Sequence, residues 1–180
     1  LSTTQPLSLS ANEVNLPPVL ASLASITNHV GATIVFVASA TDPDLPGGSL
    51  SYTLNPGAPV EATVGSATGL FQWTSSAPST NALTLRVTDS GTPALSDTKS
   101  FTIVVGPAIQ VTGIEFGPAN RQIVSWSALP GRSYQLETAT NAAANWATLG
   151  GVTTAVGASA TATNSLPAGG LRLYRVRLTN

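Results

Sequence analysis

Short apolar segments recur along this chain at spacings of about ten residues, and turns rich in glycine and proline separate them. In residues 49–55, for example, Leu50, Tyr52 and Leu54 alternate with polar residues before Pro56-Gly57 ends the segment. Alternation of this kind indicates a strand with one buried face, and regular turns between such strands are typical of an antiparallel sandwich. The chain is therefore predicted to be all-β.

Two series of expected strands divide the chain. The first series comprises residues 20–26, 33–41, 49–55, 62–64, 69–74, 82–89 and 97–105. Gly106-Pro107 interrupts the pattern, and the second series comprises residues 108–116, 122–128, 133–139, 145–150, 159–164 and 171–178. We therefore predict a lead-in or linker over residues 1–14, followed by two tandem Greek-key antiparallel β-sandwiches over residues 15–106 and 107–180.

The charge composition excludes several classes of partner. Only 8% of the 180 residues are charged and the net charge is −1, against roughly 25% charged residues in an average globular protein. No basic patch is available for nucleic acid or an anionic membrane surface, and no apolar run reaches the roughly 20 residues that span a bilayer. With no cysteine and one histidine, disulfides, thiolate chemistry and histidine-rich metal sites are excluded as well.

The same composition bears on the compartment. A chain rich in serine and threonine, poor in lysine and free of thiols is common among secreted bacterial proteins, so we expect a secreted or cell-surface location. The chain begins at Leu1 and contains no methionine. We therefore expect a mature product or a segment of a longer protein.

Acidic residues of the first half are expected to meet at one end of the first sandwich. Asp42 and Asp44 follow the second predicted strand and Asp89 follows the sixth, and these two strands run in the same direction in an up-and-down count. The first strand starts at that same end, which brings Glu13 and Asn15 within reach. Clustered carboxylates repel one another unless a cation intervenes, and hard oxygen ligands suit calcium. The alternative is that D-P-D and D-S-G are turn sequences whose aspartates accept backbone N–H bonds.

Four motifs of the first half, in this order, resemble a cadherin-like repeat of the bacterial and dystroglycan-type Ig-like kind. They are ASATDPD (38–44), GSLSYTL (48–54), ATGLFQWT (67–74) and VTDSGTPALSDTKSFTIVV (87–105). In that family the D-x-D pair and the later aspartate bind calcium at the junction with the preceding repeat. The resemblance thus implies calcium-binding roles for Asp42, Asp44 and Asp89, with Asn15 as a weaker candidate.

The second half resembles the fibronectin type III-like domain found near the C-termini of many large secreted bacterial proteins. The residues that carry this resemblance are 125–141, 145–151 and 171–178. Trp126 is expected on the inner face, and Tyr134 and Tyr174 are expected to fill the sandwich with their hydroxyls reaching backbone. The alternative is that Trp126, Trp146 and Tyr174 form a sugar-stacking platform. Packing in the core is the preferred interpretation, because buried aromatic residues are commoner than exposed ones.

The remaining charged residues give no signature of catalysis. Arg172, Arg175 and Arg177 are expected to form a solvated strip that balances Glu115 and Glu137. His29 is expected to be a solvent-facing turn residue, and no G-x-S-x-G motif accompanies it.

The sequence therefore predicts a non-catalytic spacer or adhesion module of a larger bacterial surface or secreted protein, with calcium stiffening its N-terminal pole. Its expected partners are neighbouring domains of the same chain and a protein or polysaccharide at the cell surface. The alternative function is a carbohydrate-binding accessory module of a secreted enzyme.

Overall fold

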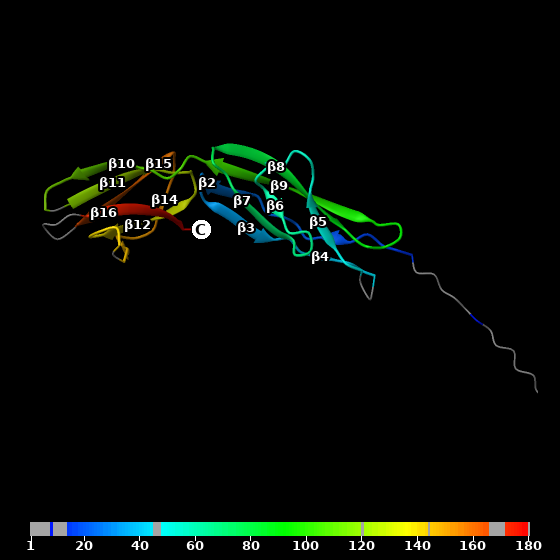
Figure 1. The fold of residues 1–180 in the computed structure, drawn as a ribbon. Coiled ribbons are helices and arrows are strands. Elements are labelled where there is room, and N and C mark those ends of the chain that lie inside the picture. Colours follow the sequence, from blue (N-terminus) through cyan, green and yellow to red (C-terminus); the bar gives the residue numbers. More distant parts are fainter. Residues whose placement is uncertain are drawn as a thin grey trace, which may run out of the picture. The chain divides into compact units, whose positions relative to one another are not determined.

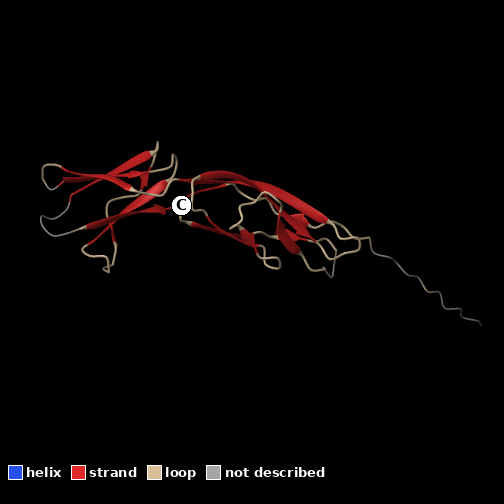
Figure 2. Cartoon of the chain, turned by 45° about the horizontal axis from the view of Figure 1, so that its top comes forward, coloured by secondary structure: helices blue, strands red, loops and turns tan. Residues whose placement is uncertain are grey.

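The computed structural model describes residue 8 and residues 14–44, 48–119, 121–143, 145–165 and 172–179. Within these residues every regular element is a strand and none is a helix, as the colours in Figure 2 show. The strand pairs are antiparallel. The prediction of an all-β chain built from antiparallel sheets is therefore confirmed. None of these residues forms a long apolar helix of the kind that crosses a membrane.

The contacts between residues divide the chain into two units. Unit 1 comprises Leu1–Ile26, Thr33–Thr74 and Thr80–Ile103. Unit 2 comprises Thr27–Ala32, Ser75–Ser79 and Val104–Asn180. The boundaries of these units do not test the expected domain division after residue 106, which stays a prediction.

Three sheets contain the first series of strands, of which β2 to β9 are labelled in Figure 1. The first pairs β1 (Val19–Leu20) with β4 (Ala40–Thr41), and the second has the order β3 (Thr33–Val37), β7 (Leu70–Thr74), β6 (Thr63–Val64). The third has the order β2 (Ile26–His29), β9 (Ser96–Gly106), β8 (Ser79–Thr88), β5 (Ser51–Leu54). Neighbouring strands are often distant in the chain, so the connections cross over, as in Greek-key sandwiches.

The core of unit 1 follows from the period-two alternation of its strands. In β8 the residues Leu83, Leu85 and Val87 are buried, with polar or partly exposed residues between them. The ring of Phe71 stacks on Phe36 at a centroid distance of 4.8 Å. Burying a side chain of this size stabilises a fold by about 1.5–3 kcal/mol. The alternation in β8 thus supplies three residues of the core.

The predicted strand over residues 33–41 is divided into β3 and β4, and a glycine explains the break. The N–H of Ala38 donates to the carbonyl of Gly69 at 2.9 Å. Gly69 has a φ of 65°, and a Cβ at this position would lie 2.3 Å from the Ala38 carbonyl oxygen. Beyond this contact β4 pairs with β1, with Ala40 opposite Leu20. The pairing brings the residues after β4 beside residues 15–18, which follow the predicted linker and which we call the lead-in segment.

Two sheets contain the second series of strands. One has the order β10 (Val111–Phe116), β11 (Arg121–Ser127), β15 (Ser159–Ser165). In the other, β12 (Ser133–Ala139) pairs with β13 (Ala147–Thr148), β14 (Thr153–Thr154) and β16 (Leu173–Thr179). The two-residue strand β14 was not anticipated, since so short a segment has no alternation to detect.

The core of unit 2 centres on two aromatic residues. Trp126 and Tyr134 are fully buried, with ring centroids 6.2 Å apart in an edge-to-face arrangement. Val124, Leu136 and Ala155 pack around them. The expected core positions of Trp126 and Tyr134 are therefore confirmed.

Candidate functional site

Asp89 organises the turn between β8 and β9 in unit 1. Its Oδ1 accepts the backbone N–H of Gly91 at 3.0 Å and that of Leu95 at 2.9 Å. The side chain is thereby held across the turn, as an aspartate that caps its own loop commonly is. Asp89 is 6% exposed, so these bonds are shielded from water.

The lead-in segment is tied to this turn by Asn15. The side-chain amide of Asn15 donates to Asp89 Oδ2 at 3.1 Å and to the carbonyl of Pro93 at 2.9 Å. Gly91 leaves room for that amide, because a Cβ there would lie 2.0 Å from Asn15 Oδ1. The turn sequence and the lead-in segment therefore fit each other closely.

The next residue of the lead-in segment joins the second pair of aspartates. The N–H of Leu16 donates to Asp44 Oδ2 at 2.7 Å, and the N–H of Asp44 donates to Asp42 Oδ1 at 3.0 Å. Two adjacent residues, Asn15 and Leu16, thus contact acids that lie far apart in the chain. We call Asn15, Leu16, Asp42, Asp44 and Asp89 the Asp89 pole.

The contacts of the Asp89 pole are those of the turn interpretation. Carboxylate oxygens of Asp42, Asp44 and Asp89 accept N–H bonds, and the amide of Asn15 acts as a donor. Within the described ranges no group of three or more acidic or histidine side chains is placed to hold a metal ion. As they lie, these residues do not fit a ready cation site, and calcium binding stays a prediction. Glu13, the fifth expected ligand, lies outside the described residues.

Asp97 also holds the start of unit 1, by a contact with β1 that was not predicted. Its Oδ2 accepts the backbone N–H of Leu20 in β1 at 2.9 Å and pairs with Lys99 Nζ, also at 2.9 Å. Residues two apart in a strand point to the same side, so the spacing in Asp-Thr-Lys was the signal available. Asp97 and Asn15 together attach both ends of the entering segment to unit 1.

Both hydrogen-bonded aspartates are easier to ionise than a free aspartate. The Leu95 N–H bond, opposed by partial desolvation and aided by Gly91 and Asn15, holds the pKa of Asp89 below its usual 3.8. The Lys99 ammonium and then the Leu20 N–H hold the pKa of Asp97 below the same value. In both cases the folded state binds a proton less readily than the unfolded chain.

We expect acid to destabilise unit 1 through these two aspartates. A folded-state pKa below 3.8 contributes stability that is complete above the unfolded value and is lost as pH falls through the folded pKa. The midpoint of thermal unfolding should therefore fall steeply below about pH 4. Asp89→Asn should lower the midpoint at neutral pH and make the acid-induced fall shallower. Calorimetry over this pH range measures both effects, with the exposed Glu61→Gln as control. An unchanged acid slope in Asp89→Asn would contradict the assignment.

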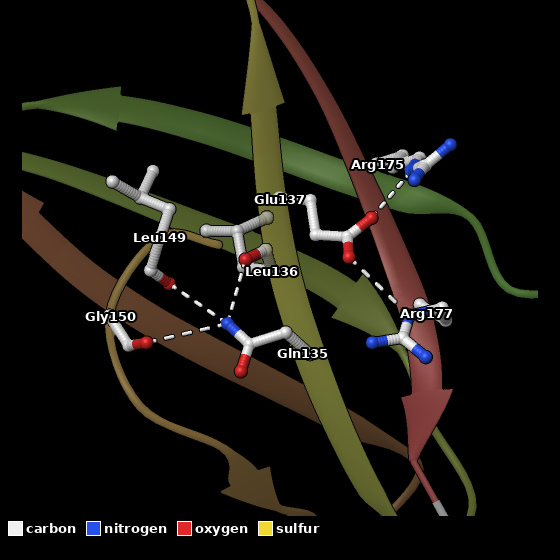
Figure 3. A network of polar contacts seen from close by, with 7 residues as sticks. All are labelled: Gln135, Leu136, Glu137, Leu149, Gly150, Arg175 and Arg177. Carbon is white, nitrogen blue, oxygen red and sulfur yellow. Dashed lines mark hydrogen bonds and ion pairs between the residues drawn. The ribbon is translucent and has the colours of Figure 1, made fainter. Parts of the chain in front are cut away.

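In unit 2 a network of polar contacts surrounds Glu137 of β12 (Figure 3). Glu137 is 5% exposed, and its carboxylate lies 2.6 Å from Arg175 Nε and 3.4 Å from Arg177 Nε. The neighbouring Gln135 side chain donates to the carbonyl of Leu136 at 2.8 Å and to those of Leu149 and Gly150. Of the expected arginine strip, Arg175 and Arg177 thus pair with Glu137. The burial of Glu137 was not predicted.

The residues expected to stack on sugar are largely engaged in contacts within the protein. Trp126 is buried, and the hydroxyl of Tyr174 donates to the side-chain oxygen of Gln122. Trp146 is partly exposed, but the Arg175 guanidinium lies over its ring at 4.5 Å from the centroid. Among the described tryptophans, Trp146 is the one with a partly exposed indole. One face of that indole is therefore covered.

The expectation of a solvent-facing His29 is wrong. His29 is buried within unit 2, with Nε2 2.8 Å from the Tyr134 hydroxyl and Nδ1 2.5 Å from the Pro107 carbonyl. The N–H of Leu129 donates to the same hydroxyl at 2.7 Å. Strand β2 extends to His29, so the ring points into the unit and not into a turn. Both ring nitrogens of His29 therefore have hydrogen-bond partners within unit 2.

Comparison with known proteins gives one family match. The model of the family described as Putative Ig domain matches residues 17–106. No curated protein matches the chain.

Solved structures similar to the chain include mouse cadherin-23 repeats EC22–24, with 22% identity and a TM-score of 0.44. Human protocadherin-24 EC1–2 has 20% identity and a TM-score of 0.42, over 59% of this chain and 56% of that one. A nucleoside hydrolase-related protein from Saccharophagus degradans has 23% identity and a TM-score of 0.42, over 51% of this chain and 26% of that one. The match to cadherin-23 covers 53% of this chain and only 33% of the cadherin-23 structure.

Proposed function

Because the chain belongs to the Putative Ig domain family through residues 17–106, we propose that it is a non-catalytic spacer or adhesion module. Its setting would be a larger bacterial surface or secreted protein, outside the cell. One observation carries the proposal: the polar groups of the Asp89 pole attach the segment that enters unit 1.

The Asp89 pole gives the proposal a mechanical basis. A pull on the lead-in segment loads the Asn15–Asp89 and Leu16–Asp44 bonds before it reaches the short β1–β4 pair. Asp97 holds Leu20 at the other end of this segment. Hydrogen bonds to charged acceptors are stronger than neutral ones, about 1.5–3 kcal/mol each. Several such bonds arranged along one segment would let tension pass into the sheets without peeling the first strand.

We further propose that unit 2 is fibronectin type III-like. The order β10-β11-β15 in one sheet and β12 between β16 and β13 in the other supports this proposal, as does the buried Trp126. The carbohydrate-binding alternative is not favoured by any contact described above, because Trp126 is in the core and Arg175 covers a face of Trp146.

Calcium stiffening of the Asp89 pole is the part of this proposal that departs furthest from the described contacts. Asp42, Asp44 and Asp89 would supply the carboxylate oxygens, which at present accept N–H bonds. A calcium ion would have to compete with these donors, and isolated extracellular modules often bind calcium only at about 10⁻⁴–10⁻³ M.

Single-molecule pulling on the two ends of the chain tests the mechanical role. We expect cooperative unfolding peaks, and Asn15→Ala should lower the force of the peak in which unit 1 opens. Asn145→Ala, an exposed asparagine of unit 2, is the matched control and should leave that peak unchanged. A chain that extends without a resolvable peak would overturn the spacer proposal.

Two further measurements separate the alternatives. Retention on polysaccharide columns, lost in Trp146→Ala, would favour the carbohydrate-binding module instead. Addition of calcium up to about 1 mM should raise the unfolding force if the ion binds at this pole, and Asp42→Asn should abolish the rise. No response to calcium would leave the spacer proposal intact and remove the ion from it.

A further inference from the structure

Strands β10 and β16 of unit 2 each lie at an edge of their sheet. Strand β10 ends the sheet β10-β11-β15, and β16 pairs with β12 and with no other described strand. An edge strand presents a row of unpaired backbone N–H and C=O groups that can add another strand. The two edges belong to different sheets, so one molecule can offer one edge and receive the other.

The edge of β16 borders a groove that is lined by both apolar and polar residues. Val176 and Leu178 lie opposite Leu136 and Tyr134 of β12, so they face the core, where they are only partly buried. Beside them is an open groove of about 430 Å³ whose lining also includes Ile109. The complete lining comprises residues 28–32, 108–109 and 176–178. A groove of this size accommodates large apolar side chains.

The other face of β16 is basic. Arg175 and Arg177 lie opposite Glu137 and Gln135, on the side away from the core, and their side chains are 49% and 60% exposed. A strand added to this edge would therefore meet Val176 and Leu178 on its inner face and guanidinium groups on its outer face.

Strand β10 carries the complementary pattern. Ile114 lies opposite the buried Val124, so it faces the core side of its sheet, and Phe116, two residues on, faces the same side. These side chains are 40% and 75% exposed, which is high for core-facing residues. Glu115 between them faces the opposite side.

We propose that β10 of one copy pairs antiparallel with β16 of a second copy. In the register that places Glu115 beside Arg177, Ile114 lies beside Leu178 and Phe116 beside Val176. Both apolar residues then enter the groove while the acid meets the arginines. A slip by one residue would turn Glu115 toward the groove and Phe116 toward the arginines, so the pattern selects this register.

The contact is head-to-tail, because it joins two different edges. Each copy can offer β10 to one neighbour and receive β10 from another, which gives a ring or an open array. A single strand pair is a small interface, so association is expected to be weak in dilute solution and stronger where copies are displayed densely. The inference rests on the adhesion part of the proposed function and names its partner as the same chain.

Sedimentation velocity over concentrations up to about 1 mM tests the self-association. The unmodified chain should associate, and Phe116→Lys should weaken association at least about tenfold by placing a charge in the groove. Val156→Lys, at a 98% exposed valine outside both edges, is the matched control and should associate normally. Circular dichroism verifies that each variant is folded. A chain that stays monomeric throughout, or a Phe116→Lys variant that associates normally, would overturn the proposal.

Cysteine crosslinking tests the register in the full chain, which has no cysteine of its own. Directly opposite strand residues have Cα atoms about 4.5–5.5 Å apart, within the range of a disulfide. A mixture of Glu115→Cys and Arg177→Cys chains should give a crosslinked dimer with oxidised glutathione, and neither variant alone should do so. Dimers from Glu115→Cys alone would indicate symmetric β10 pairing and overturn the assignment. The pulling experiment on single molecules is independent of this result, so failure here leaves the spacer role standing.

Discussion

Replacing both Arg175 and Arg177 by methionine should destabilise unit 2 by about 2–4 kcal/mol, whereas Glu137→Gln should cost about 1 kcal/mol or less. The asymmetry comes from burial. Glu137 is enclosed, while its two partners are half-exposed. Removing the acid releases two guanidinium groups that water can solvate. Removing the arginines leaves a buried carboxylate without a cation, and methionine keeps most of the covering hydrocarbon stem. The loss therefore reports the charge together with the contact between Arg175 and Trp146.

Urea unfolding of a Trp73→Phe background, followed by tryptophan fluorescence, measures this difference. The remaining tryptophans, Trp126 and Trp146, lie in unit 2, so the signal reports that unit. Arg121→Met, at an exposed arginine of β11, is the control for loss of one positive charge. Equal destabilisation by the double methionine variant and by Glu137→Gln would mean that Glu137 is solvated in the folded state.

The strands were predictable where alternation alone decides the structure. The segment 133–139 coincides with β12, and 122–128 differs from β11 by one residue at each end. The division of 33–41 was not predictable, because it depends on the backbone of Gly69 approaching Ala38 from a distant part of the chain. Which strands pair depends on residues that are distant in sequence, and a local pattern carries no information about them.

The candidate site divides in the same way. Counting strand directions indicated that Asp42, Asp44 and Asp89 share an end, and Asn15 and Leu16 do contact the last two. Whether the aspartate oxygens bind a cation or accept backbone N–H bonds was not predictable, since D-P-D and D-S-G sequences suit both.

Burial of polar residues was the hardest feature to predict. In β12 the alternation of Tyr134 and Leu136 indicates one buried face, and by the same logic Gln135 and Glu137 should be exposed. The outer face is instead covered by the β16 arginines and by the loop at Leu149–Gly150. His29 is a parallel case, because its partners Pro107 and Tyr134 lie far along the chain.

Trp126→Ala should destabilise unit 2 by about 3–5 kcal/mol, the largest effect expected from any single substitution discussed for this chain. The indole is fully buried between Tyr134 and the aliphatic core, and truncation to alanine leaves a cavity that two facing sheets cannot close without moving. The loss should exceed that from any exposed aromatic residue, including Phe116, whose ring is already in water.

Trp126→Phe separates packing from polarity at the same position. The indole Nε1 is buried and has no hydrogen-bond partner among the described residues, so the tryptophan already carries the cost of an unpaired donor. Phenylalanine loses apolar area but removes that donor, and the two changes partly cancel. We expect about 1–2 kcal/mol for Trp126→Phe, well below the alanine value, in urea unfolding followed by circular dichroism. A phenylalanine variant as unstable as the alanine variant would mean that the indole nitrogen has a partner, such as a buried water, that stabilises it.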